Sequence, residues 1–143
     1  TDAGRKKMRR GARGLRALVP SITLLGTSPL VRAAQTAAIV RDAYDAPEPV
    51  TVGALVPDRA PADFGSWLRD VAPGEGDVIA AVGHEPHLSA LVSWFLAERV
   101  HPPLVALRKG GACLVALAAA RAAGRGRLEW LLTPAQLRAV GSA

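Results

Sequence analysis

The chain reads Thr27-Ser28-Pro29-Leu30-Val31-Arg32-Ala33-Ala34-Gln35-Thr36, and this stretch decides the fold. The apolar run before it, residues 22–25, is short and β-branched enough for a buried strand. Ser28-Pro29 ends the strand, because proline has the φ angle of a first helical residue and serine caps free helix N–H groups. In the helix predicted next, Arg32 lies in the first turn. A cation at a helix N-terminus is typical of an anion site; the alternative is a surface arginine on an ordinary βα unit.

The composition describes one domain with an aliphatic core. The chain has 143 residues, of which 50% are hydrophobic and only 4% aromatic, so the core is predicted to consist of Ala, Val and Leu. The lone Cys113 excludes an internal disulfide framework and favours the cytoplasm. The longest apolar run, residues 112–120, is far below the roughly 20 residues that cross a bilayer, so no membrane partner is expected.

The net charge of +6 is concentrated near the start of the chain. Met8, Ala12 and Leu15 recur at helical spacing, and arginines form the opposite stripe. This pattern predicts an amphipathic helix with a solvated basic face. The segment has no aromatic side chains to stack on bases and no nucleic-acid motif, so an acidic protein is a better partner than nucleic acid.

Apolar strands alternate with helices along the chain. This order predicts an α/β fold: a three-layer α/β/α sandwich with helices on both faces of a mostly parallel sheet. The predicted helices cover residues 1–18, 30–44, 61–71, 86–97 and 135–140. The predicted strands cover residues 22–26, 50–52, 78–82, 104–107, 112–118 and 127–132, the last two as an antiparallel hairpin across residues 122–126.

A second strand–helix junction resembles the first. His84 follows the apolar strand at residues 78–82, and a helix is predicted directly after it. In open α/β sheets, ligands bind outside the carboxyl ends of the strands, where Arg32 and His84 would both lie. Arginine forks onto two phosphate oxygens, and histidine donates to a third or transfers a proton. The alternative is a turn histidine without chemistry.

Three segments together resemble one known family. Residues 27–37 resemble the Ser-Pro-x-x-Arg-Ala-x-Gln-Thr segment of the histidine phosphatase superfamily. Residues 82–88 are similar to its Gly-His-x-Pro segment, and residues 1–5 to its Leu-Thr-x-x-Gly segment. The small size of the chain and the sequence of its Gly-His-x-Pro motif most resemble the SixA-type phosphohistidine phosphatases. The resemblance implies a phosphoglycerate mutase-like fold.

The resemblance also implies a mechanism. A histidine in an Arg-His-Gly or Arg-His-Ala motif on the first strand attacks phosphorus, and water hydrolyses the phosphoenzyme. Arg32 and His84 correspond to the second arginine and second histidine that hold the phosphoryl oxygens, with Ser28 beside them. The substrate would be a phosphohistidine protein or a small phosphate ester. No metal or cofactor is expected, because arginines and histidines neutralise the charge.

The family's Arg-His motif is absent from the sequence. The histidines are His84, His87 and His101, and none of them follows an arginine. The family places the motif before the segment with which this sequence opens, so we expect a first strand upstream of Thr1. The alternative is a phosphate-binding module that has lost the nucleophile.

Further candidates have weaker signals. Glu85 is adjacent to His84, and capping of the next helix would also explain it. Asp58 and Asp63 lie in the loop where larger relatives carry a proton-donating acid. His87 is predicted to be a surface or capping histidine, and His101 a loop residue.

Overall fold

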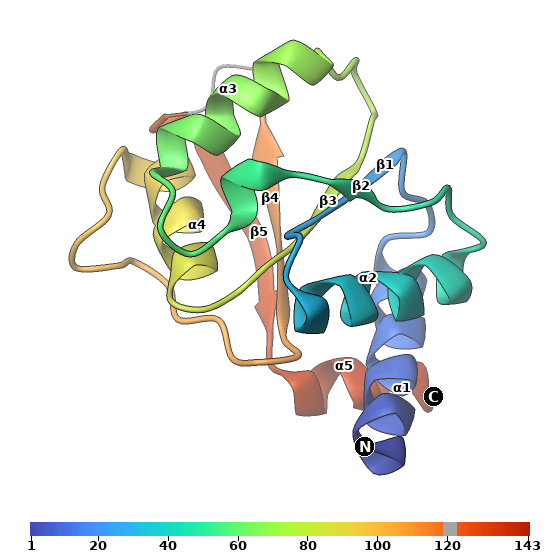
Figure 1. The fold of residues 1–143 in the computed structure, drawn as a ribbon. Coiled ribbons are helices and arrows are strands. Elements are labelled where there is room, and N and C mark those ends of the chain that lie inside the picture. Colours follow the sequence, from blue (N-terminus) through green and yellow to red (C-terminus); the bar gives the residue numbers. More distant parts are fainter. Residues whose placement is uncertain (119–122) are drawn as a thin grey trace.

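In the computed structural model, which describes residues 1–118 and 123–143, helices and strands follow the predicted order (Figure 1). The helices are α1 (Asp2–Leu18), α2 (Val31–Tyr44), α3 (Pro61–Val71), α4 (His87–Ala97) and α5 (Pro134–Gly141), with a short 3₁₀ helix η1 (Gly53–Leu55). The strands are β1 (Leu24–Thr27), β2 (Val50–Thr51), β3 (Ile79–Val82), β4 (Ala112–Leu117) and β5 (Gly126–Leu132).

The strands form two groups. β2, β1 and β3 make a parallel sheet in that order, with Thr27 opposite Val82. β4 and β5 pair antiparallel, which confirms the predicted hairpin. Part of its predicted turn, at residue 122, lies outside the described residues. The combination of helices with a parallel sheet confirms the α/β class.

Two hydrophobic clusters lie on opposite faces of the parallel sheet. Leu25 of β1 is buried in a cluster with Ala12 of α1 and Val40 of α2. The next residue, Gly26, faces the other way, because a Cβ there would lie 3.0 Å from Val52 Cγ2. Val52 belongs to the second cluster, which α3 and α4 cover. Alternation along β1 therefore separates the two helical layers.

The predicted strand at residues 104–107 is wrong. This segment is irregular, because side chains of α4 satisfy its backbone N–H groups in place of a strand partner. The Leu104 amide donates to Ser93 Oγ over 2.8 Å, and the Leu107 amide donates to Ser89 Oγ over 3.0 Å. The serine hydroxyls thus hold the segment against α4.

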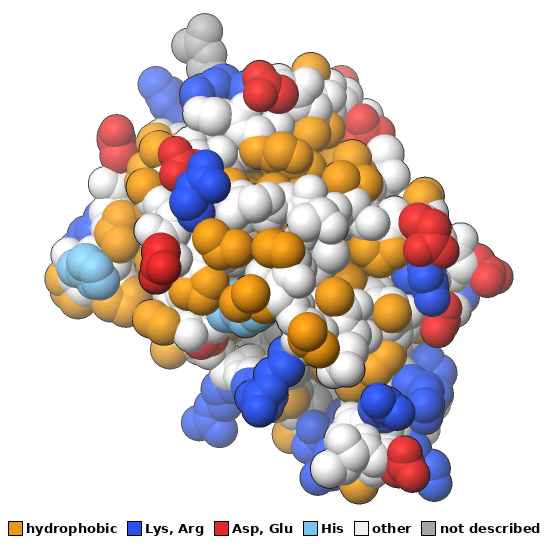
Figure 2. Space-filling view, viewed as in Figure 1, with side chains coloured by type: hydrophobic (Ala, Val, Ile, Leu, Met, Phe, Trp, Pro, Cys, Tyr) orange, Lys and Arg blue, Asp and Glu red, His pale blue; other side chains and the backbone are white. Residues whose placement is uncertain are grey.

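Helix α1 has the amphipathic form that the sequence predicts. Ala12 is buried, while the Lys and Arg side chains of the helix are exposed. Figure 2 shows basic side chains gathered at the lower right, where Figure 1 places α1. Among the described residues, no helix is both long and apolar enough to span a membrane.

Candidate active site

Ser28 and His84 meet where two neighbouring strands end. Ser28 follows β1 directly, and its amide donates to the Val82 carbonyl of β3 over 2.9 Å. His84 follows β3 by two residues, and its Nε2 lies 2.8 Å from Ser28 Oγ. Because β1 and β3 are parallel and adjacent, their carboxyl ends bring together two residues that are 56 positions apart in the chain.

Ser28 is fully buried and also organises the start of α2. Its Oγ accepts a hydrogen bond from the Leu30 amide over 3.3 Å. The helix predicted at residues 30–44 begins one residue later, at Val31: Leu30, in an extended conformation, is the N-cap, and Pro29 precedes the helix. Since Oγ accepts from Leu30, the Ser28 hydroxyl proton remains free to point toward His84.

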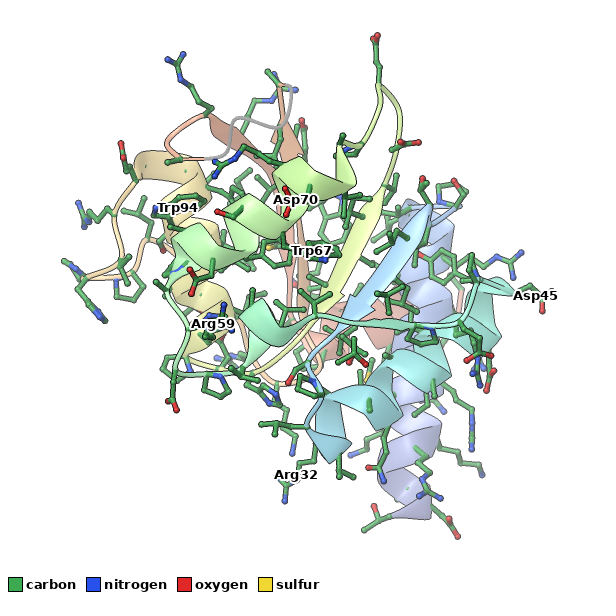
Figure 3. All side chains as sticks on the ribbon, turned by 45° about the horizontal axis from the view of Figure 1, so that its top comes forward. Arg32, Asp45, Arg59, Trp67, Asp70 and Trp94 are labelled. Atoms are coloured by element: carbon green, nitrogen blue, oxygen red, sulfur yellow. The ribbon has the colours of Figure 1, made fainter. Side chains whose placement is uncertain are left out.

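Arg32 lies in the first turn of α2 and is exposed. Figure 3 shows its side chain extending outward from the start of the helix. Among the described residues, its guanidinium takes part in no hydrogen bond or ion pair. Arg32 therefore makes no hydrogen bond to Ser28 or His84 in the part of the chain that the structure describes, and its donors are available to an anion.

Glu85 caps α4. Its carboxylate accepts hydrogen bonds from both the amide and the hydroxyl of Ser89, one turn into the helix. The carboxylate thereby satisfies a free N–H group at the helix N-terminus. This geometry gives Glu85 a structural role and directs its oxygens into α4.

His87 is buried, so its predicted surface position is wrong. Only 5% of the residue is exposed, and Nε2 donates to the Arg59 carbonyl over 3.0 Å. Nδ1 is buried with no hydrogen-bond partner among the described residues. Burial lowers the pKa of His87, and the neighbouring His84 acts in the same direction, whereas the Arg59 carbonyl and Glu85 oppose it.

We expect His87 to make stability fall in mild acid. Below about pH 6.5, the unfolded chain binds a proton that native His87 resists, because its native pKa is lowered. The unfolded state then binds more protons, so the free energy of unfolding falls as pH drops from about 6.5 toward the native pKa. The slope is at most about 1.4 kcal/mol per pH unit.

Urea unfolding of His87→Gln across this pH range checks the expectation. Glutamine keeps an N–H donor for the Arg59 carbonyl but does not titrate. Its pH slope should be shallower than that of the parent protein, and His101→Gln, at an exposed loop residue, should keep the parent slope. An unchanged slope in His87→Gln would refute the role of this histidine.

Asp58 and Asp63 lie in different settings. Asp58 is an exposed residue of the segment between η1 and α3. Asp63 was predicted in the loop but lies in the first turn of α3, where it accepts a hydrogen bond from Arg59 Nε over 2.8 Å. This position agrees with the helix predicted at residues 61–71, which already includes Asp63. The ion pair partly neutralises Asp63.

Sequence reasoning missed the polar residues inside α4. Ser89 and Ser93 are buried, and the Ser93 hydroxyl donates to the Ser89 carbonyl over 2.8 Å. The available signal was their spacing: two serines four residues apart lie on one face of an otherwise apolar helix. Within residues 1–118 and 123–143, no three His, Cys, Asp or Glu side chains gather as a metal site would require.

Comparisons with known proteins identify the fold. No protein-family model matches the chain, and no curated protein matches its sequence. The chain is similar to the solved structure of the protein histidine phosphatase SixA complexed with tungstate, with a TM-score of 0.78 and 23% sequence identity. The match covers 96% of this chain and 85% of that chain. This chain therefore has the SixA-type histidine phosphatase fold.

Proposed function

We propose that this protein is a phosphatase that hydrolyses a phosphohistidine protein or a small phosphate ester through a phosphohistidine intermediate. The observation that carries the proposal is the 2.8 Å contact between Ser28 Oγ and His84 Nε2 at the carboxyl ends of β1 and β3. Tungstate, which the SixA structure contains, is a tetrahedral oxyanion like phosphate. The shared fold and the paired polar groups support an oxyanion site here.

Each residue of the site has a distinct task. The Arg32 guanidinium binds two phosphoryl oxygens in a fork. His84, oriented by Ser28, donates to another oxygen and stabilises the charge that develops in the transition state. The free N–H groups in the first turn of α2 add positive potential at the same end of the helix. Because these cationic groups neutralise the phosphoryl charge, we expect turnover to require neither a metal ion nor a cofactor. We also place the protein in the cytoplasm.

The proposal assigns the nucleophile to a histidine upstream of Thr1. It would follow a strand that pairs between β3 and β4. In the described residues β3 pairs only with β1, and β4 pairs only with β5. Ile79 of β3 and Val115 of β4 nevertheless pack against the same hydrophobic cluster. A strand between them would satisfy both open edges.

The second candidate function is a phosphate-binding module without turnover. It is favoured by the sequence itself, because none of the three histidines follows an arginine. Such a module would retain the oxyanion contacts of Arg32 and His84, and would bind a phosphorylated protein without hydrolysing it.

One experiment separates the two functions. The protein carrying its upstream residues is assayed with a phosphohistidine protein and with a chromogenic phosphate ester, and tungstate binding is measured by calorimetry. Turnover of either substrate supports the phosphatase. Tungstate binding without turnover of either substrate, in folded protein, supports the binding module. Loss of both properties would refute the site.

A further inference from the structure

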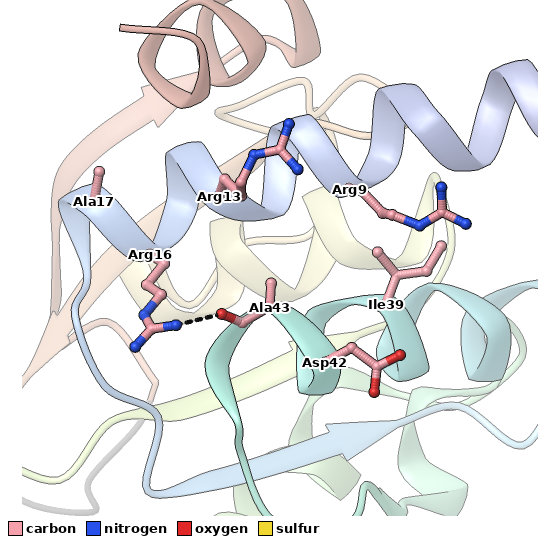
Figure 4. Close-up of a pocket in the computed structure, with 7 residues that line it drawn as sticks. All are labelled: Arg9, Arg13, Arg16, Ala17, Ile39, Asp42 and Ala43. Carbon is pink, nitrogen blue, oxygen red and sulfur yellow. Dashed lines mark hydrogen bonds between the residues drawn. The ribbon is translucent and has the colours of Figure 1, made fainter.

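A groove with a basic wall lies between α1 and α2. It has a volume of about 640 Å³ and is lined by Arg9, Arg13, Arg16, Ala17, Ile39, Asp42 and Ala43 (Figure 4). A second hollow, lined by Asp2, Ala3, Lys6 and Arg9, adjoins it, since Arg9 borders both. The two hollows therefore share Arg9 on the exposed face of α1.

Two guanidiniums in this groove lack a partner in the structure. In the described part of the chain, ion pairs use Arg41, Arg59 and Arg127, while Arg9 and Arg13 have no carboxylate within 4.0 Å. Asp42, the acidic residue of the larger hollow, already pairs with Arg41 over 3.1 Å. The groove thus presents uncompensated positive charge.

Arg16 differs from the other two arginines. Its guanidinium donates to the Ala43 carbonyl over 2.7 Å, as the dashed line in Figure 4 shows. This bond satisfies a carbonyl in the last turn of α2, where a cation is favourable. Arg16 therefore fixes one helix against the other, and leaves Arg9 and Arg13 to meet a ligand.

The groove leads toward the candidate active site. Ile39 and Ala43 lie seven and eleven residues beyond Arg32 on α2, so helical spacing places all three on one stripe. The rise from Arg32 to Ile39 is about 10 Å. A protein chain that delivers a phosphoryl group to Arg32 is long enough to reach the groove, whereas a small ester is not.

We propose that this groove docks an acidic, amphipathic segment of the protein substrate next to its phosphohistidine; the inference rests on the proposed function and selects a protein as the substrate class. Carboxylates of the segment pair with Arg9 and Arg13, and its apolar side chains pack on Ile39 and Ala43. Nucleic acid fits less well, because Asp42 borders the groove and no aromatic side chain lines it.

Binding is tested first, without any need for catalysis. The probe is a fluorescein-labelled helical peptide of about 15 residues, with Glu at the spacing of the arginines and Leu on the adjoining face. Arg9→Glu/Arg13→Glu should weaken its binding by at least about tenfold, because like charges then oppose each other. Arg5→Glu/Lys7→Glu is the matched control, since it changes the charge by the same amount on the same helix outside both hollows; its binding should be unchanged.

Kinetics then connect the groove to the substrate. For the protein with its upstream residues, the double variant should raise KM for a phosphohistidine protein at least about tenfold at unchanged kcat. Turnover of the small chromogenic ester should stay the same. Equal loss in Arg5→Glu/Lys7→Glu, no peptide binding by the parent protein, or tighter binding of a DNA duplex than of the peptide would overturn the proposal. If the peptide binds through Arg9 and Arg13 but the protein shows no turnover, the docking groove is supported and the phosphatase function is refuted.

Discussion

Replacing Arg32 with alanine is expected to lower phosphatase turnover about 10²–10³-fold, as loss of one oxyanion donor does. The guanidinium has no partner in the described structure, so its binding energy is available to the phosphoryl group. Its charge becomes most effective as negative charge develops on the phosphoryl oxygens. The affinity of Arg32→Ala for tungstate should also fall, and calorimetry on residues 1–143 measures it.

Two comparisons make the Arg32 result specific. Arg32→Lys keeps the charge but loses the two-pronged fork, so its activity should lie between the parent and the alanine variant. Arg127→Ala removes an exposed arginine of β5 that pairs with Glu129, and should leave turnover unchanged. The melting temperature of Arg32→Ala should equal that of the parent. Unchanged turnover in Arg32→Ala would remove this residue from the site.

Gly14→Ala is expected to produce a large loss of stability. A Cβ on Gly14 would lie 2.0 Å from the Leu137 carbonyl oxygen of α5, and a Cβ on Gly141 would lie 2.1 Å from the Arg10 carbonyl oxygen. Backbone atoms cannot rotate away, so α1 and α5 would have to separate. We expect a cost of about 2–3 kcal/mol, and a Tm lower by roughly 10 °C, measured by thermal unfolding.

Gly11→Ala is the matched control for Gly14→Ala. It lies three residues earlier in the same helix, and a Cβ there would meet nothing within 4 Å. Alanine is a better helix former than glycine, so this variant should gain about 0.5–1 kcal/mol. Opposite signs at the two glycines would show that helix contact, and not helix propensity, decides the result. Equal effects would contradict this explanation.

Local sequence patterns predicted most helices and strands. They failed where a residue's hydrogen-bond partner lies far away in the sequence. The spacing of apolar residues predicted α1, α3 and the hairpin. It also predicted a strand at residues 104–107, which is irregular because Ser89 and Ser93 bind its amides. The buried position of His87 likewise depends on the Arg59 carbonyl, 28 residues away. No local pattern contains such contacts.

The sequence by itself determined the α/β class, the basic face of α1 and the two strand–helix junctions, because hydrophobic periodicity, proline and glycine act on neighbouring residues. Only the tertiary structure decided that Ser28 and His84 touch, because parallel pairing of β1 with β3 sets their distance. It also decided that Glu85 faces α4, that Gly14 permits the α1–α5 contact, and that Arg9 and Arg13 border a groove. These properties depend on long-range packing, which the order of residues specifies only through the complete fold.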